Sequence, residues 1–133
     1  MPPSLKGKIL VLDTHAFIWF LADDPKLSDT AKAAIQEGLE QKALLVLPSI
    51  VLAEAIDIVQ KKRTHLKLDA IWRAIEQRSL HLWPLDEAVL REMAELDPSV
   101  EIHDRIIAAV ALLLGGAVIT KDQQIAKLAP VVW

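Results

Sequence analysis

Residues 8–22 read KILVLDTHAFIWFLA, a stretch that changes character at a single carboxylate. The apolar run at residues 9–12 has the composition of a buried strand, and the segment after Asp13 is expected to be a helix. Asp13 therefore has two interpretations. It either ends the strand and caps the helix, or it lies at the mouth of an active site. The choice between them depends on whether other acidic residues reach the same place.

The rest of the chain repeats this alternation of a short apolar run and a longer helical segment. Further strands are predicted at residues 44–47, 80–83, 117–119 and 131–133, and helices at 29–39, 50–63, 68–78, 87–96 and 104–114. Ser28, Ser49 and Asp86 are expected to cap three of these helices, and Gly115 to end the last. Strand–helix alternation with nearly continuous apolar strands predicts an α/β fold with a central, mostly parallel sheet of about five strands flanked by helices.

The composition excludes several classes of protein. With 53% hydrophobic and 25% charged residues among 133, the chain is globular rather than disordered. The net charge of −3 provides no overall basic footprint. This argues against a nucleic-acid-binding module that relies on phosphate attraction, but not against an enzyme that meets phosphate through bound metal. The absence of cysteine excludes disulfides, zinc–thiolate sites and cysteine nucleophiles.

The apolar segments are too short for membrane or export functions. The longest, residues 106–114, is far below the roughly 20 residues of a membrane-spanning helix, and the run before Asp13 is too short for the core of a signal peptide. We therefore expect a cytoplasmic domain without membrane contact. A mean hydropathy of +0.31 indicates an apolar surplus. This surplus favours a partner or dimer surface, the alternative being a core rich in alanine and leucine.

Four acidic residues from distant parts of the chain are expected at the carboxyl edge of the sheet, where open parallel sheets bind ligands. Asp13 ends the first strand, and Asp122 follows the fourth. Asp104 lies in the first turn of the helix that leads back to the fourth strand. Glu54 lies about a turn and a half beyond the second strand, in a segment that is otherwise almost wholly apolar.

Each carboxylate also has a purely structural explanation. Asp13 and Asp122 could be helix caps, and Asp104 in a first turn is favourable to the helix dipole. Glu54 is harder to explain in this way, because burying a carboxylate is costly and position 58, one turn on, is isoleucine. Clustered acids repel one another unless a cation is present, and hard oxygen ligands suit Mg²⁺ or Mn²⁺. The joint pattern favours a metal site over coincidental caps.

The segments LDTHAFIWFL, SIVLAEAIDIV, HDRIIAAVALLLGGAVITKDQQI and VVW together resemble PIN-domain proteins, and in particular the VapC toxins of toxin–antitoxin pairs. The resemblance spans essentially the whole chain and implies a single PIN-like domain at residues 1–133. It also implies a metal-dependent endoribonuclease with one or two Mg²⁺ or Mn²⁺ ions. The acids that match the family's catalytic and metal-binding positions are Asp13, Glu54, Asp104 and Asp122.

The resemblance extends to neighbouring residues and to partners. Thr14 and Thr120 match hydroxyl residues that accompany the first and fourth acids, and Arg105 could pair with an acid or with phosphate. The implied partners are an RNA substrate, with tRNA or rRNA favoured, a small antitoxin, and a second copy in a homodimer. One departure is the run DPSVEIHDR, where many relatives have a sequence like DPFDR. Asp97 and Glu101 therefore receive no catalytic role.

Other features leave alternatives open. His15 and His103 lie beside the acids without metal-ligand spacing, so each is either polar packing or an RNA contact. Phe17, Trp19 and Phe20 fall within one short helix, which favours a dimer or antitoxin surface over core packing alone. The competing functions are a catalytically silent PIN-fold binding module and a phosphoacceptor receiver-like domain. The intact acids oppose the first, and the lack of an acceptor aspartate at the end of a central strand opposes the second.

Overall fold

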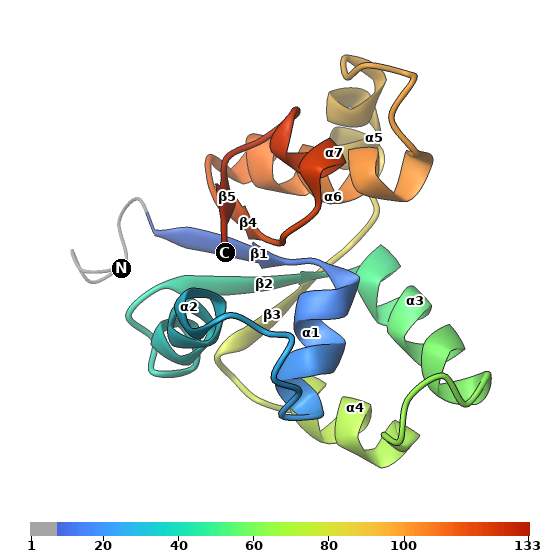
Figure 1. The fold of residues 1–133 in the computed structure, drawn as a ribbon. Helices are drawn as coiled ribbons and strands as arrows, with labels where there is room; N and C mark the ends of the chain where they lie inside the picture. Colours follow the sequence, from blue (N-terminus) through green and yellow to red (C-terminus); the bar gives the residue numbers. More distant parts are fainter. Residues whose placement is uncertain (1–7) are drawn as a thin grey trace.

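Five short apolar runs form one sheet in the computed structural model, which describes residues 8–133 (Figure 1). The strands are β1 (Ile9–Leu12), β2 (Leu44–Pro48), β3 (Leu80–Trp83), β4 (Ala117–Ile119) and β5 (Val131–Val132). Every pairing between them is parallel, in the order β3-β2-β1-β4-β5. The prediction of an α/β fold with a parallel sheet is therefore confirmed. The predicted domain also includes residues 1–7, which lie outside the described residues.

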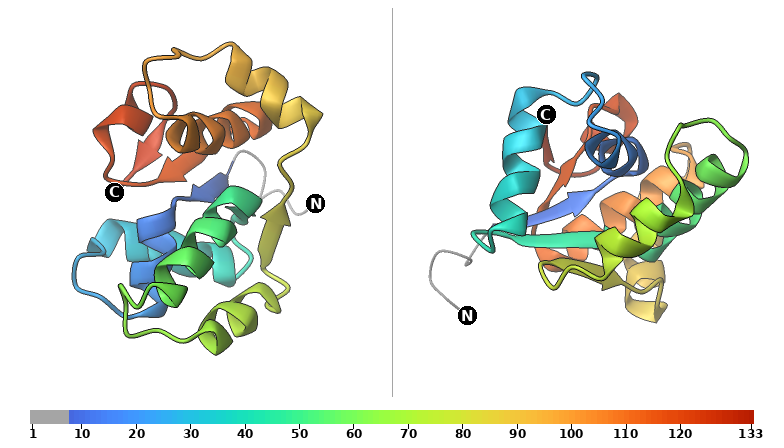
Figure 2. Two further views of the ribbon diagram at one scale, coloured as in Figure 1. Left: turned by 90° about the vertical axis from the view of Figure 1, so that its right-hand side faces the viewer. Right: turned by 90° about the horizontal axis from the view of Figure 1, so that it is seen from below.

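Helices cover both faces of the sheet, which is why its central strands are apolar on both sides. They are α1 (Thr14–Leu21), α2 (Asp29–Leu39), α3 (Ser49–Gln60), α4 (Leu68–Ile75), α5 (Glu87–Ala94), α6 (Ile102–Leu114) and α7 (Gln123–Ala126). Figures 1 and 2 show α1 to α4 on one side of the sheet and α5 to α7 on the other. In the part of the chain that the structure describes, no helix has the length and apolar character needed to cross a membrane.

Three of the four residues predicted to cap or end a helix are confirmed. Ser28 and Asp86 cap α2 and α5 through their side chains, and Gly115 ends α6 in the left-handed region at φ 71°, which glycine adopts without strain. The prediction for Ser49 is wrong. Pro48 occupies the N-cap of α3, and no side chain caps that helix, because Ser49 has already entered it as its first residue.

Four helices differ in extent from the prediction, the fifth by ending at Ala94 rather than at residue 96. The third ends at Gln60, since the chain turns through Lys62 at a positive φ of 55°. The fourth ends at Ile75 rather than at residue 78. The sixth begins two residues early, at Ile102, because the side chain of Glu101 caps it by accepting hydrogen bonds from backbone amides. Helix ends fray and depend on such local partners, which apolar periodicity does not report.

The strand order creates a topological switch point beside β1. The chain leaves β1 for β2 on one side and later returns to place β4 on the other. Leu12 of β1 is in register with Ile119 of β4, so Asp13 and Thr120 leave the sheet side by side. At such a switch point the following helices diverge to opposite faces, which opens a crevice beyond the carboxyl ends of the two strands.

A continuous apolar core holds this edge in place. Val11, Val46 and Val118, on three adjacent central strands, are fully buried. Phe17 is only 2% exposed and belongs to this core. Phe17 therefore packs chiefly as core, whereas Trp19 and Phe20 are half-buried and retain the exposed area that a partner surface needs.

Candidate active site

Asp13 lies at the end of β1 and is 8% exposed. Its Oδ1 accepts a hydrogen bond from the backbone amide of Ala16 at 2.7 Å, so Asp13 caps α1. Burial raises the pKa of the Asp13 carboxyl, while the neighbouring Thr120 hydroxyl and the Ala16 amide act in the lowering direction. The charge of Asp122 adds to the rise. Asp13 is therefore a helix cap, and burial makes its carboxylate costly to keep charged.

Asp122 reaches the same edge from β4. The backbone amide of Asp13 donates to the carbonyl of Ile119 at 3.4 Å, which joins the two strand ends. Beyond Ile119, the hydroxyl of the buried Thr120 accepts a hydrogen bond from the Asp122 amide at 3.0 Å. The carboxylate of Asp122 in turn accepts from the amide of Gln124 at 2.7 Å and caps α7. Thr120 thus shapes the turn that brings Asp122 back towards Asp13.

Glu54 comes from α3 and contacts the first turn of α1. The hydroxyl of Thr14 donates to Glu54 Oε1 at 2.8 Å, a link between residues 40 positions apart. Val51 and Ala55, on the same helix, are fully buried and anchor α3 in the core. Because these neighbours hold the helix, Glu54 is directed towards the edge where Asp13 and Thr14 lie. This hydrogen bond offsets part of the cost of placing the Glu54 carboxylate in an apolar segment.

Asp104 lies in the first turn of α6, on the opposite face of the sheet from α3. Its pKa is raised from 3.8 to about 6, first by burial and then by the negative charges of neighbouring carboxylates. In order of effect these neighbours are Asp122, Glu101, Glu54 and Asp13. All four acids singled out from the sequence therefore lie close enough for their charges to interact. They arrive from β1, α3, α6 and the β4–α7 turn, at the switch point.

Glu101 is a member of this acidic region that the sequence did not identify as one. Its carboxylate accepts from the amides of His103, at 2.9 Å, and Asp104, at 3.2 Å, and also contacts the ring of His103. Partial desolvation tends to raise the pKa of Glu101, but the hydrogen bonds from His103 and Asp104 outweigh it and lower the pKa. A glutamate three residues before an acid at a helix start was the available signal.

Two further residues near α6 have structural partners. Arg105 donates from Nε to the carbonyl of Val100 at 2.8 Å, so it ties the first turn of α6 to the preceding loop. Asp97 accepts from both the amide and the hydroxyl of Ser99, at 2.9 and 2.8 Å, which lowers its pKa. Asp97 therefore shapes the loop before α6.

The donor chemistry of the cluster fits a hard divalent cation. Carboxylate oxygens are the preferred ligands of Mg²⁺ and Mn²⁺. The pKa of Asp104 is raised first by burial and then by four neighbouring carboxylates, so a bound cation would stabilise its charged form. Within residues 8–133, however, no three or more His, Cys, Asp or Glu side chains form a group that could hold a metal ion as they stand. Asp13 and Asp122 are engaged as caps, and Glu54 is bound to Thr14.

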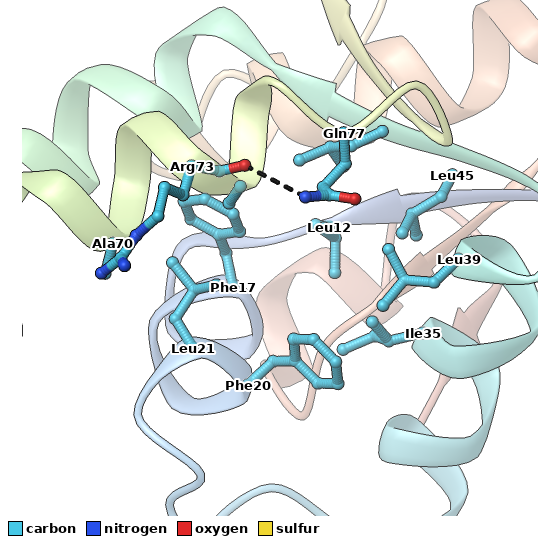
Figure 3. Close-up of a pocket in the computed structure, with 12 residues that line it drawn as sticks. Leu12, Phe17, Phe20, Leu21, Ile35, Leu39, Leu45, Ala70, Arg73 and Gln77 are labelled. Atoms are coloured by element: carbon cyan, nitrogen blue, oxygen red, sulfur yellow. Dashed lines mark hydrogen bonds between the residues drawn. The ribbon is translucent and has the colours of Figure 1, made fainter.

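Two cavities flank α1 on different sides. One, of about 220 Å³, opens beside the acids and is lined by Asp13, His15, Trp19, Lys121, Asp122 and Trp133. The other, of about 290 Å³, is apolar and lies between α1, α2 and α4 (Figure 3). In Figure 3, Phe17, Phe20 and Leu21 of α1 point towards it, with Arg73 and Gln77 at its rim. Phe17 and Phe20 of α1 thus line the apolar cavity, whereas Trp19 lines the cavity beside the acids.

Comparison with known proteins gives a family match and several structural matches. A family model described as PIN domain matches residues 10–130. FitAcB from Neisseria gonorrhoeae is similar at a TM-score of 0.70 and 22% identity, covering 92% of this chain and 95% of that one. VapBC2 from Rickettsia felis, bound to a DNA fragment from its promoter, matches at 0.67 and 18%, covering 92% and 96%. A toxin–antitoxin complex from Klebsiella pneumoniae matches at 0.66 and 16%, covering 93% and 96%.

Proposed function

This chain belongs to the PIN domain family, and we propose on that premise that it is a metal-dependent endoribonuclease and the toxin of a toxin–antitoxin pair. The observation that carries the proposal is the set of carboxylates at the switch point, where burial and then the charges of the neighbouring acids raise the pKa of Asp104 to about 6. A protein gains nothing in stability from placing four acids together without a cation. The arrangement is explained if the acids hold Mg²⁺ or Mn²⁺.

In this proposal Asp13, Glu54, Asp104 and Asp122 hold the metal. When bound, the ion supplies charge stabilisation at the phosphoryl oxygens and lowers the pKa of water for attack on the phosphodiester. The protein's own residues prepare the site. Thr14 orients Glu54 through its 2.8 Å hydrogen bond. Thr120 shapes the turn that carries Asp122.

Arg105 has a positioning role in this scheme. Its Nε is bound to the carbonyl of Val100, so it fixes where α6 begins and hence where Asp104 stands. We infer no direct contact of Arg105 with the substrate. Expected substrates are tRNA or rRNA, and cleavage would take place in the cytoplasm.

The proposed antitoxin would occupy the apolar cavity of Figure 3. Phe20, Leu21 and Leu39 line it with apolar surface, and Arg73 lies at its rim. A segment with an apolar anchor beside an acidic residue would complement this lining. Support comes from the relatives of similar fold, one of which is described as a toxin–antitoxin complex.

We also propose a homodimer formed through β3 and α5. β3 is an edge strand of the sheet, with open backbone groups along one side. Leu82 on that strand is 49% exposed, and Leu85 and Leu90, which follow it in the chain, are 41% and 43% exposed. A second copy covering these residues would remove apolar surface that otherwise faces water.

The test of the nuclease is RNA cleavage by an Asp13→Asn variant. Asparagine caps helices about as well as aspartate, so the fold should be retained while one negative charge leaves the cluster. Cleavage of a tRNA and rRNA panel in Mg²⁺ or Mn²⁺ should fall by orders of magnitude in this variant and stop in EDTA. Glu54→Gln should behave alike, because the amide oxygen can still accept from Thr14.

The matched control is Asp86→Asn. Asp86 also caps a helix, accepting from the Val89 amide at 3.0 Å, but it lies on α5 outside the cluster. Its replacement should leave cleavage unchanged. Full activity in Asp13→Asn would reject the metal-nuclease proposal and leave Asp13 as a cap alone. No cleavage of any RNA by the wild-type protein, with growth inhibition retained, would favour a silent binding module.

A further inference from the structure

The small cavity beside the acids has an aromatic and basic wall that the proposed metal chemistry does not use. His15 and Trp19 lie one turn apart on α1, with ring centroids 5.3 Å apart and planes at 38°. Trp133, which follows β5, meets the edge of Trp19 at 6.0 Å and 62°. Three rings from two distant segments therefore surround one cavity of about 220 Å³, and its acidic side is formed by Asp13 and Asp122.

Lys121 completes this wall, and a second lysine, Lys26, lies near the Trp19 ring without lining the cavity. The Nζ of Lys121, between Thr120 and Asp122, lies 4.9 Å from the centroid of the Trp19 ring. The Nζ of Lys26 lies 5.7 Å from the same ring. Both lysines are exposed, whereas Trp19 is half-buried. The Trp19 ring is therefore packed against the protein, whereas the two lysine side chains face solvent.

We propose that this cavity binds one nucleobase of a single-stranded RNA, stacked on Trp19, from the nucleotide next to the phosphate held at the acids. The inference rests on the proposed nuclease function, because the cavity shares Asp13 and Asp122 with that site. Stacking of a base on an indole is stronger than the contact of an exposed lysine with the same ring. The base therefore displaces Lys121 from the Trp19 ring, and the ammonium of Lys121 moves to a flanking phosphate.

The lining favours RNA over a protein partner. An apolar side chain entering this cavity would have to desolvate Asp13, Asp122 and Lys121 without compensating hydrogen bonds. A nucleotide brings a flat apolar face for Trp19 and a negative group for Lys121. An apolar anchor already has a better-matched cavity on the other side of α1, lined by Phe17 and Phe20.

The experiment separates base stacking from phosphate binding. Wild type, Trp19→Leu, Trp19→Phe and Lys121→Gln are titrated with a short oligoadenylate and with inorganic polyphosphate, in Ca²⁺, following tryptophan fluorescence and anisotropy. Trp19→Leu should weaken oligoadenylate binding by about five- to 150-fold and polyphosphate binding by less than about twofold. Trp19→Phe should restore most of the oligoadenylate affinity, because phenylalanine retains a face for stacking. Lys121→Gln should weaken both ligands.

Matched controls guard against loss of fold. Trp72→Leu removes a 40% exposed tryptophan on α4 that does not line the cavity, and it should bind both probes as wild type does. Melting curves are recorded for every variant. If Trp19→Leu is unstable, the Lys121→Gln result decides, since this exposed side chain can be changed without disturbing the core.

Wild-type oligoadenylate affinity in Trp19→Leu, or no effect of Lys121→Gln on either probe, would overturn the inference. So would weaker capture of the antitoxin by Trp19→Leu with unchanged RNA binding, because the cavity would then serve the protein partner. A different outcome would overturn the nuclease proposal. Trp19-dependent binding without any RNA cleavage would leave the base site standing alone, and cleavage with Trp19-independent binding would leave only the nuclease.

Discussion

Replacing Asp104 with asparagine should stabilise the metal-free protein at neutral pH. The pKa of Asp104 is raised from 3.8 to about 6, chiefly by burial and by the charge of Asp122. A rise of about two pKa units corresponds to about 3 kcal/mol of cost for the charged form. Asp104 is only partly buried, so solvent screening reduces this to about 1–2 kcal/mol. Loss of a favourable helix-dipole contact removes about 0.3–1 kcal/mol of the gain.

The net gain of about 1 kcal/mol should raise the melting temperature by about 3–5 °C for a domain of this size. Its pH dependence has a definite sign. The folded state holds the Asp104 proton more tightly than the unfolded state, so wild-type stability declines as pH rises from 3.8 towards the folded pKa of about 6. The advantage of Asp104→Asn should therefore be near zero at the acidic end of this window and level off above it.

The assay is urea unfolding in EDTA, followed by circular dichroism across this pH range. Asp69→Asn is the matched control, since Asp69 also lies in the first turn of a helix, α4, but outside the acidic cluster. This control should lose a few tenths of a kcal/mol or more through the dipole alone. If Asp104→Asn were less stable than wild type at neutral pH, or if its advantage did not change with pH, charge repulsion would not be the dominant role of Asp104.

Two further predictions concern ligands and partners. Mg²⁺ or Mn²⁺ should stabilise the wild-type protein, by about 2.7 kcal/mol at a hundredfold excess over the dissociation constant, and the shift should be much smaller in Asp104→Asn. An equal shift in both proteins, measured by thermal melting, would place the ion elsewhere. Expression should slow the growth of a bacterial host, and co-expression of the neighbouring gene should restore it. Ala70→Glu, which puts a charge into the cavity of Figure 3, should block that rescue, whereas Ala88→Glu on the exposed side of α5 should not.

The strands and their parallel arrangement could be predicted because they depend on local pattern. A strand covered on both faces, such as residues 9–12, needs an unbroken apolar run, and this requirement is visible in the sequence. Side-chain caps such as Ser28 and Asp86 are equally local. The prediction for Ser49 is wrong because serine often caps helices, whereas here the preceding proline, already extended at φ −61° and ψ 141°, supplies the turn into the helix.

The features of the fold and the site that the sequence did not predict depend on contacts between distant segments. That β1 lies between β2 and β4 follows from long-range packing, and this order decides which carboxylates become neighbours. Glu101 offered only a local signal, its position three residues before Asp104, and its closeness to the acids of other segments arises only once α6 crosses the sheet edge. The approach of Lys121 and Trp133 to Trp19 likewise joins residues more than a hundred positions apart. No periodicity or motif within one segment encodes such a meeting.

The two interpretations of Asp13, helix cap or active-site ligand, are compatible in this structure. Asp13 and Asp122 each accept a backbone amide at 2.7 Å through a single oxygen, Oδ1. A carboxylate has two oxygens and about four acceptor positions, so the cap leaves the second oxygen available to a cation. The cap also restricts rotation of the side chain, and a ligand held in one orientation loses less entropy when it binds a metal. Capping therefore fixes the orientation of the carboxylates that follow β1 and β4. For this reason a role as a helix cap does not exclude a role as a metal ligand for either acid.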